Sequence, residues 1–180
     1  MGLNMPRDVI VKDAGKKGRG LFANRDFKKG EVILFYDLTT VKKRYTLEEI
    51  ERSGIDSEHR EYVRRGKYVL DYSPASYVNH SCDPNAYVEF KTLSKKYLIA
   101  LKPIRKREEI TKDYTLEAID QIDNETWILN CNCGSKDCRK KVTGDFFKLP
   151  KEIQKKKLPY LPTWVKKKYK DRIKGLLEDS

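Results

Sequence analysis

The sequence has no long apolar run. Nowhere in its 180 residues do about 18 consecutive apolar residues occur, the length that a helix needs to cross a bilayer. Residues 1–8, Met-Gly-Leu-Asn-Met-Pro-Arg-Asp, also lack the apolar segment of a secretory signal peptide. We therefore expect no membrane association and no secretion.

Cysteine and histidine are scarce, with four Cys and two His in the chain. Cys131, Cys133 and Cys138 fall within eight residues, a distribution that does not suit the disulfide framework of a small secreted protein. We expect free or metal-bound thiols in a reducing intracellular compartment. This would be the cytoplasm or nucleoid of a prokaryote, or the nucleus of a eukaryote.

The charge is unevenly distributed. The chain carries 39 Lys and Arg against 27 Asp and Glu, a net charge of +12, and residues 139–180 contribute +9 of it. Both a solvated amphipathic helix and a basic surface for nucleic acid or an acidic partner fit such a segment. Any association with DNA or chromatin is therefore expected in this C-terminal region.

Turn residues separate many short apolar segments in the first two thirds of the chain. Runs of β-branched and aromatic residues bounded by Gly, Pro, Ser or Asp are typical of strands. The pattern favours a mainly β or α+β fold over a doubly wound parallel sheet. The expected strands are residues 8–12, 31–36, 67–71, 86–90, 96–101 and 108–114.

Helical signals are confined to three segments. Residues 46–49, Thr-Leu-Glu-Glu, form a capping box, and we expect the helical insert that they begin to continue to Gly66. Residues 151–158 and 163–178 also have helical spacing. The apolar face expected for the last segment consists of Val165, Tyr169, Ile173, Leu176 and Leu177.

A glycine-containing segment at residues 15–23 superficially fits the dinucleotide-binding fingerprint through Gly18, Gly20 and Ala23. That fingerprint opens a helix within a βαβ unit, whose crossover takes at least about 10–12 residues. Gly30 follows seven residues after Ala23 and a strand pattern begins there, so no helix fits. Two alternatives remain: an ordinary hairpin turn, and a loop whose backbone amides approach a ligand closely.

A tight polar segment at residues 77–85, Tyr-Val-Asn-His-Ser-Cys-Asp-Pro-Asn, holds His80 and the isolated Cys82. Side chains of this kind next to Pro favour turns. The other three cysteines have C-x-C-x4-C spacing, and Cys82 brings the set to the four thiolates of a closed tetrahedral zinc site. Reduced cysteines buried as small apolar side chains are the alternative. A Cys-His nucleophile pair is not favoured, because a spacing of two residues does not by itself aim the thiol at the imidazole.

Four segments resemble motifs of the SET-domain lysine methyltransferases. Residues 77–85 resemble the signature [FY]-x-N-H-S-C-x-P-N, and residues 131–139 resemble the post-SET motif C-x-C-x4-C-R. Residues 107–114 are similar to G-E-E-[LI]-T-x-D-Y, and residues 15–23 are similar to the first cofactor motif. The resemblance extends over about residues 8–145. It implies a SET fold of small curved sheets, in which the N-H-S-C stretch threads beneath another loop.

The resemblance also implies a division of the chain. A SET domain would occupy residues 1–120, with the helical insert at about 46–66. A post-SET zinc-binding segment would occupy residues 121–147, and a basic helical extension residues 148–180.

The implied cofactor is S-adenosylmethionine and the implied metal is a structural zinc ion. The catalytic tyrosine would be Tyr114, and Tyr36 would line the lysine channel because residues 30–36 resemble G-x-x-[IV]-x-x-Y. Tyr87 is a weaker channel candidate. The implied zinc ligands are Cys82, Cys131, Cys133 and Cys138. The implied cofactor-binding residues are Lys17, Gly18, Arg19, Gly20, Asn79, His80 and Tyr114, with His80 acting chiefly through its backbone.

The chain departs from the family pattern at four positions. Ser76 replaces an Arg, and Arg107 and Lys140 each replace a Gly. Lys112 stands where a Phe or Tyr commonly tunes the number of methyl groups added, so the resemblance does not indicate mono-, di- or trimethylation. The candidates for covering the adenine are Val142, Phe146 and Phe147.

Three hypotheses follow. The favoured one is a protein-lysine methyltransferase that uses S-adenosylmethionine and modifies a lysine of a chromatin protein or of another protein. The second is a basic, zinc-stabilised nucleic-acid-binding module without turnover. The third is a SET-like protein made inactive because Lys112 crowds the channel. Residues 79–80 (Asn-His) and 113–114 (Asp-Tyr) favour the first hypothesis over the second, because a binding module needs neither pair.

Overall fold

The computed structural model describes residues 7–54, 59–124 and 127–178. The chain forms two compact units. The first consists of Met1–Asn79 and Pro84–Lys112, and the second of His80–Asp83 and Asp113–Ser180. The polar segment around His80 therefore belongs in part to the second unit, although the chain on both sides of it belongs to the first.

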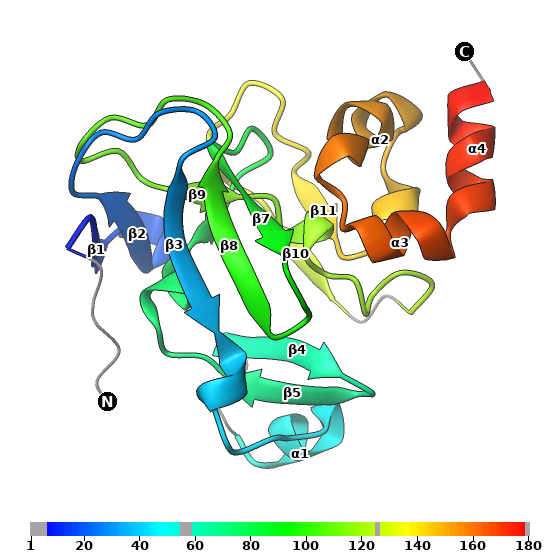
Figure 1. The fold of residues 1–180 in the computed structure, drawn as a ribbon, viewed down its shortest axis with the longest axis horizontal. Coiled ribbons are helices and arrows are strands. Elements are labelled where there is room, and N and C mark those ends of the chain that lie inside the picture. The colour runs from blue at the N-terminus through cyan, green and yellow to red at the C-terminus, as the bar shows by residue number, and fades with distance from the viewer. Residues whose placement is uncertain (1–6, 55–58, 125–126, 179–180) are drawn as a thin grey trace. The chain divides into compact units, whose positions relative to one another are not determined.

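Short antiparallel strands build the first unit (Figure 1). β1 (Val9–Asp13) pairs with β2 (Arg19–Ala23) in a hairpin. β8 (Lys95–Ala100) is the central strand of a three-stranded sheet, with β3 (Val32–Asp37) on one side and β7 (Ala86–Phe90) on the other. These strands confirm the expected pattern, and β2 confirms that no helix follows the glycine-containing segment.

α1 (Leu47–Arg52) begins where the capping box predicts. The Thr46 hydroxyl accepts a hydrogen bond from the Glu49 backbone N–H at 3.1 Å. In return, the Glu49 carboxylate accepts one from the Thr46 N–H at 2.5 Å. This reciprocal pair satisfies two of the N–H groups that a helix start leaves without partners.

The second half of the expected helical insert is a hairpin, so that expectation is wrong. β4 (Arg60–Arg64) pairs with β5 (Lys67–Leu70). Arg65 and Gly66 have φ angles of 47° and 67°, and a two-residue type I′ turn requires positive φ at both positions. Gly66 therefore closes a hairpin and not a helix. Residues 55–58 of the expected helical insert lie outside the described residues.

The apolar core of the first unit lies among these strands. Leu21, Val69, Ala86 and Ile110 have no exposed surface. The strand expected at residues 108–114 is regular only in β9 (Thr111–Lys112). Further along, the chain turns into a short 3₁₀ helix, Tyr114–Leu116, in the second unit. β6 (Asn79–His80) is equally short.

Among its described residues, the second unit contains a small antiparallel strand pair followed by the α-helices α2, α3 and α4 (Figure 1). β10 (Ile128–Asn130), which was not expected, pairs with β11 (Lys141–Thr143). The expected helices are present as α2 (Lys151–Lys157), α3 (Thr163–Lys168) and α4 (Lys170–Glu178).

The expected helix over residues 163–178 is interrupted. Tyr169, between α3 and α4, has φ −108° and ψ 30°, outside the helical range. Val165 and Leu176 of the predicted apolar face are buried, but Leu177 is 54% exposed, so the predicted face is only partly correct. In the part of the chain that the structure describes, no helix has the length and apolarity required to cross a membrane.

Candidate functional site

In the first unit, Glu109 contacts two of the predicted cofactor-binding residues, and one of these contacts a third. Its carboxylate lies 2.7 Å from the Lys17 ammonium and accepts a hydrogen bond from Asn79 Nδ2 at 2.9 Å. Asn79 Nδ2 also donates to the backbone carbonyl of Arg19 at 3.1 Å. Lys17, Arg19 and Asn79 therefore meet although 60 residues separate the last two in sequence. Glu109 was part of a quoted motif, but sequence reasoning gave it no role.

The two glycines among the predicted cofactor-binding residues, Gly18 and Gly20, differ in environment. Gly18 is exposed and has φ 74° in the turn between β1 and β2. Gly20 is buried, and a Cβ there would lie 2.9 Å from both the Ala14 Cβ and the Asn79 Nδ2. A side chain at position 20 would therefore displace Asn79, which explains glycine at that position.

Asn85 fixes the backbone that follows Glu109. Its side-chain oxygen accepts a hydrogen bond from the Thr111 N–H at 2.8 Å, and its Nδ2 donates to the Glu109 carbonyl at 2.8 Å. Asn85 is buried. The asparagine at the end of the polar segment is thus a structural clamp within the first unit, a role that the sequence did not reveal.

Tyr36, the predicted channel tyrosine, is buried on β3 in the first unit. The ammonium of Lys96, a residue that is 2% exposed, lies 5.7 Å from the Tyr36 ring centroid and 2.6 Å from Glu61 Oε2. Burial alone would raise the pKa of Glu61, but the positive charges of Lys96 and Lys112 hold it below its ordinary value. Lys112 is itself buried, so a charged cluster occupies this part of the unit. Tyr87 is half-buried on β7.

Two departures from the family pattern have an unusual backbone conformation. Arg107 has φ 74° and Lys140 has φ 63°, the left-handed region that favours glycine. Both positions carry Gly in the family motifs. The chain thus keeps the glycine-type turn at each position with a basic residue in its place.

The four cysteines converge in the second unit. Their sulfur atoms all lie within 4.8 Å of one another, and the Cys82 and Cys131 sulfurs are 3.8 Å apart. A disulfide would require about 2.05 Å. Four sulfurs about 2.3 Å from a central zinc ion would form a tetrahedron with edges of roughly 3.8 Å, so the observed spacing fits the metal. The segment turns at Gly134, and Cys138 N–H donates to the Ser135 carbonyl at 3.1 Å.

The thiols have very different proton affinities. Burial raises the pKa of Cys131 to about 12. Burial would also raise that of Cys133, but hydrogen bonds from the Cys82 backbone and the Ser135 hydroxyl lower it to about 5. Four adjacent thiolates would repel one another, and a divalent cation would remove that repulsion. The donor set therefore fits zinc chemically as well as geometrically.

His80 and Tyr114, which are separated by 34 residues, lie together in the second unit. The Tyr114 backbone N–H donates to His80 Nδ1 at 3.2 Å, and the two ring centroids are 5.3 Å apart. Since Nδ1 accepts this bond, the neutral ring carries its proton on Nε2. Nε2 lies 3.4 Å from the Cys82 sulfur.

The Cys82 thiol does lie against the His80 imidazole, contrary to what the two-residue spacing led us to expect. The sulfur is nevertheless buried, and it also accepts hydrogen bonds from Arg139 N and Arg139 Nε, each at 3.3 Å. These donors and Cys131 surround it, which suits a metal ligand with outer hydrogen bonds and not a nucleophile open to substrate.

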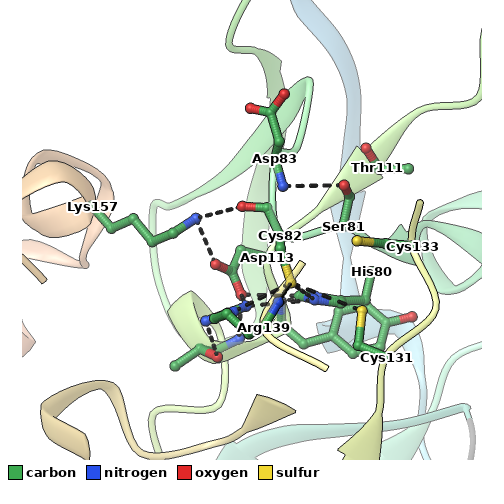
Figure 2. A network of polar contacts seen from close by, with 12 residues as sticks. His80, Ser81, Cys82, Asp83, Thr111, Asp113, Cys131, Cys133, Arg139 and Lys157 are labelled. Carbon is green, nitrogen blue, oxygen red and sulfur yellow. Dashed lines mark hydrogen bonds and ion pairs between the residues drawn. The ribbon is translucent and has the colours of Figure 1, made fainter. Parts of the chain in front are cut away.

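Asp113 is the centre of the polar network of the second unit (Figure 2). It is 1% exposed, and its Oδ1 lies 2.7 Å from Arg139 Nη2 and accepts the Thr115 backbone N–H at 3.2 Å. Its Oδ2 lies 2.7 Å from Lys157 Nζ. Burial would raise the pKa of Asp113, but the positive charges of Lys157 and Arg139 lower it below its ordinary value. Asp113 therefore carries a full negative charge beside Tyr114.

The three side chains predicted to cover an adenine differ in their solvent exposure. Val142 and Phe146 are buried in the second unit. Phe147 is half-buried, and its ring lies 4.1 Å from the Arg172 guanidinium and 5.2 Å from the Tyr169 ring. Phe147 is thus the member of the three with accessible surface.

The chain is similar to histone-lysine methyltransferases. It is 30% identical over 147 residues to "Histone-lysine N-methyltransferase 2D" of Homo sapiens, covering 74% of this chain and 2% of that protein. It is 31% identical over 140 residues to "Histone-lysine N-methyltransferase trithorax" of Drosophila virilis, covering 68% of this chain and 3% of that protein. The chain thus spans a small fraction of the length of these relatives.

The fold also has a solved counterpart. The methyltransferase domain of human "Histone-lysine N-methyltransferase SETMAR" superimposes with a TM-score of 0.53 at 22% sequence identity. The match covers 75% of this chain and 57% of that one. The described residues of this chain form small sheets and a few helices, and with this structural match they confirm the predicted mainly β or α+β class.

A match to the SET domain extends over residues 18–115. This range includes Asn79 and His80 of β6, and also Asp113 and Tyr114, where the longer segment of the second unit begins. More than half of the chain is therefore accounted for by one family, and the protein belongs to the SET-domain family.

Proposed function

We propose that this chain is an S-adenosylmethionine-dependent protein-lysine N-methyltransferase. The observation that carries the proposal is the SET-domain match over residues 18–115, which contains both the predicted catalytic Tyr114 and the predicted channel tyrosine, Tyr36. The relatives described above are named as histone-lysine methyltransferases. We propose that the substrate is a lysine side chain of a protein, and that a histone or another chromatin protein supplies it.

The chemistry requires an uncharged amine. A lysine ammonium has an ordinary pKa of about 10.4, so the site must accept the amine deprotonated and hold it away from water. The lysine ammonium would first lose a proton to solvent. The neutral nitrogen would then bond to the methyl carbon as the carbon–sulfur bond breaks, which gives a methylated ammonium and a neutral thioether. In this proposal the hydroxyl of Tyr114 orients the amine and Tyr36 lines the channel.

S-adenosylmethionine would supply the electrophilic methyl group on its sulfonium sulfur. We propose that Lys17, Gly18, Arg19, Gly20, Asn79, His80 and Tyr114 bind it. The contacts of Glu109 with Lys17 and Asn79, and of Asn79 with the Arg19 carbonyl, support this assignment for the first unit. The contact between Tyr114 and His80 supports it for the second. When the cofactor binds, Lys17 and Asn79 would give up their contacts with Glu109 and contact the cofactor instead.

We further propose that Cys82, Cys131, Cys133 and Cys138 bind a structural zinc ion. The mutual sulfur distances and the Arg139 hydrogen bonds to Cys82 support this assignment. Four protein thiolates fill a tetrahedral zinc site, so the ion would have no position for substrate. It would organise the second unit without taking part in catalysis. Thiolate ligands of this kind fit a reducing intracellular compartment.

Methyl transfer is the test of the proposed activity. Zinc-loaded protein is incubated with radiolabelled S-adenosylmethionine and with purified core histones or unrelated lysine-rich proteins. We expect label on a lysine ε-nitrogen, identified by mass spectrometry. Cofactor binding without label on any protein of the panel would support the inactive SET-like alternative and would overturn the proposed activity.

A second proposal concerns DNA. The lysines of α3 and α4 give this part of the second unit a positive surface, because Lys167, Lys168 and Lys170 are exposed. Such a surface suits phosphate contacts without sequence specificity. Deletion of residues 150–180 would not test this, because α2 carries the buried Lys157. The appropriate variant replaces the three exposed lysines by Met.

We expect the triple variant Lys167→Met, Lys168→Met, Lys170→Met to weaken binding to duplex DNA. The slope of log affinity against log salt should fall by roughly 2–3, since each phosphate contact contributes about 0.9. Fluorescence anisotropy at several salt concentrations gives the slope. The control replaces three exposed lysines of the first unit, Lys28, Lys29 and Lys91, with the same change in net charge. Equal slopes for the two triple variants would remove the proposal.

A further inference from the structure

Lys157 is an exception among the basic residues of α2. Lys151 and Lys156 are exposed, whereas Lys157, at the end of the helix, is 9% exposed. Burial of a lysine ammonium is unfavourable unless a charged or polar partner compensates for lost hydration. The position of Lys157 therefore indicates a specific interaction and not a solvated basic face.

An ion pair and a hydrogen bond hold the Lys157 ammonium inside the second unit (Figure 2). Nζ lies 2.7 Å from Asp113 Oδ2 and donates to the Cys82 backbone carbonyl at 3.3 Å. Asp113 immediately precedes the predicted catalytic tyrosine, and Cys82 is a predicted zinc ligand. One side chain from the C-terminal extension thus contacts both parts of the proposed site.

The helix that carries Lys157 is fixed on the same side. Gln154, three residues earlier and therefore on the same helical face, is buried. Its Nε2 donates to the backbone carbonyls of Leu149 at 2.6 Å and Phe147 at 3.1 Å. These bonds anchor the middle of α2, so the Lys157 side chain reaches Asp113 from a fixed base.

The Asp113 carboxylate in turn controls the backbone of Tyr114. Asp113 is the N-cap of the 3₁₀ helix Tyr114–Leu116, and its Oδ1 accepts the Thr115 N–H. Arg139 binds Oδ1, and Lys157 is the ion-pair partner at Oδ2. Without Lys157 the carboxylate would be free to rotate toward Arg139, and the cap that sets the direction of Tyr114 would change.

We propose that Lys157 is a positioning residue of the methyl-transfer site, acting through its ion pair with Asp113 on the turn that carries Tyr114. This inference rests on the proposed function. Lys157 lies outside the SET-domain match, which ends at residue 115. It follows that α2 is an integral part of the active enzyme, and that the C-terminal extension has a role distinct from any contact with DNA.

The test compares Lys157→Met with Lys156→Met, the same change one residue earlier at an exposed position. We expect Lys157→Met to retain zinc and to lower kcat at least tenfold, with a smaller change in KM for S-adenosylmethionine. Lys156→Met should have the wild-type kcat. Lys157→Arg should recover part of the loss, because a guanidinium restores the charge opposite Asp113.

A double-variant cycle separates positioning from general stability. In the background Asp113→Asn, the further change Lys157→Met should alter kcat by less than twofold, because its partner charge is already absent. Lys157→Met that keeps zinc and has a kcat within twofold of wild type would overturn the inference, as would fully independent effects of the two changes.

A readout without turnover keeps this inference separate from the proposed activity. The ring NMR signals of Tyr114, assigned by their loss in Tyr114→Phe, should shift or broaden in Lys157→Met but not in Lys156→Met. Absence of methyl transfer in the wild type would overturn the proposed function alone. Unchanged Tyr114 signals in Lys157→Met would overturn the positioning role alone.

Discussion

Replacement of Tyr114 by Phe is expected to lower kcat for methyl transfer by roughly 10²-fold or more, the usual range when a group that orients or accepts a proton is removed. The change removes only the hydroxyl. The backbone bond from Tyr114 N–H to His80 Nδ1, the ring contact with His80 and the Asp113 cap all remain. Zinc content and the melting temperature should therefore stay close to wild type.

The measurement is steady-state methyl transfer at saturating cofactor. Tyr72→Phe is the matched control, because Tyr72 is 58% exposed in the first unit and has no assigned role. We expect Tyr72→Phe to have the wild-type rate. A Tyr114→Phe protein with kcat within twofold of wild type would show that this hydroxyl does not orient the amine.

Replacement of Cys82, one of the four proposed zinc ligands, is expected to have the largest effect on structure. Cys82 lies far in sequence from the other three ligands of the proposed site. The site would therefore join the residues around Cys82 to the segment after residue 130. The binding energy of structural zinc in small peptides is about 10–16 kcal/mol and is coupled to folding. Cys82→Ser should bind much less than one zinc per chain, and the second unit should lose hydrogen-exchange protection.

The first unit should keep its protection, because its own apolar core contains no residue of the zinc site. Zinc content is measured by mass spectrometry of the metal, and protection by hydrogen exchange. Asp137→Asn serves as the control, since Asp137 is an exposed residue inside the cysteine run. One tightly bound zinc in Cys82→Ser, with unchanged exchange, would contradict a four-thiolate site.

The pH dependence of zinc affinity follows from the same thiols. Metal binding displaces a proton from each thiol that is protonated in the metal-free protein. Burial raises the pKa of Cys131 to about 12, so this thiol is protonated at neutral pH and must release its proton. Zinc affinity should therefore decrease as the pH falls.

The sequence predicted the parts of the site that depend on local spacing. The C-x-C-x4-C run, the isolated Cys82 and the capping box at Thr46 each have a pattern with a direct physical reason. The convergence of the four sulfur atoms in the structure agrees with the predicted set.

Contacts between distant residues could not be predicted in this way. Nothing local distinguishes Lys157 from the exposed Lys156, because only the location of Asp113 makes one of them a buried partner. The same holds for Glu109. From sequence alone it resembles any acidic surface residue, and only the fold brings Lys17 and Asn79 into contact with it. Long-range partners of charged side chains are decided by the fold.

The error at β4 has a different origin. Residues 60–64 follow a real helix start, and glycine is common at helix ends, so the local pattern up to Gly66 favours a longer helix. The alternative was visible in the aromatic and β-branched residues Tyr62, Val63, Tyr68 and Val69 on both sides of Arg65–Gly66, a pattern typical of a hairpin. Pairing with β5 decided between the two.

Calorimetric titration of the zinc-loaded protein with S-adenosylmethionine tests the central claim most directly, because it requires no knowledge of the substrate. We predict one binding site per chain and an affinity at least tenfold weaker in Asn79→Ala, with Asn24→Ala, an exposed asparagine of the first unit, as the control at wild-type affinity. A folded, zinc-loaded wild type that gives no binding heat at millimolar cofactor would contradict the account.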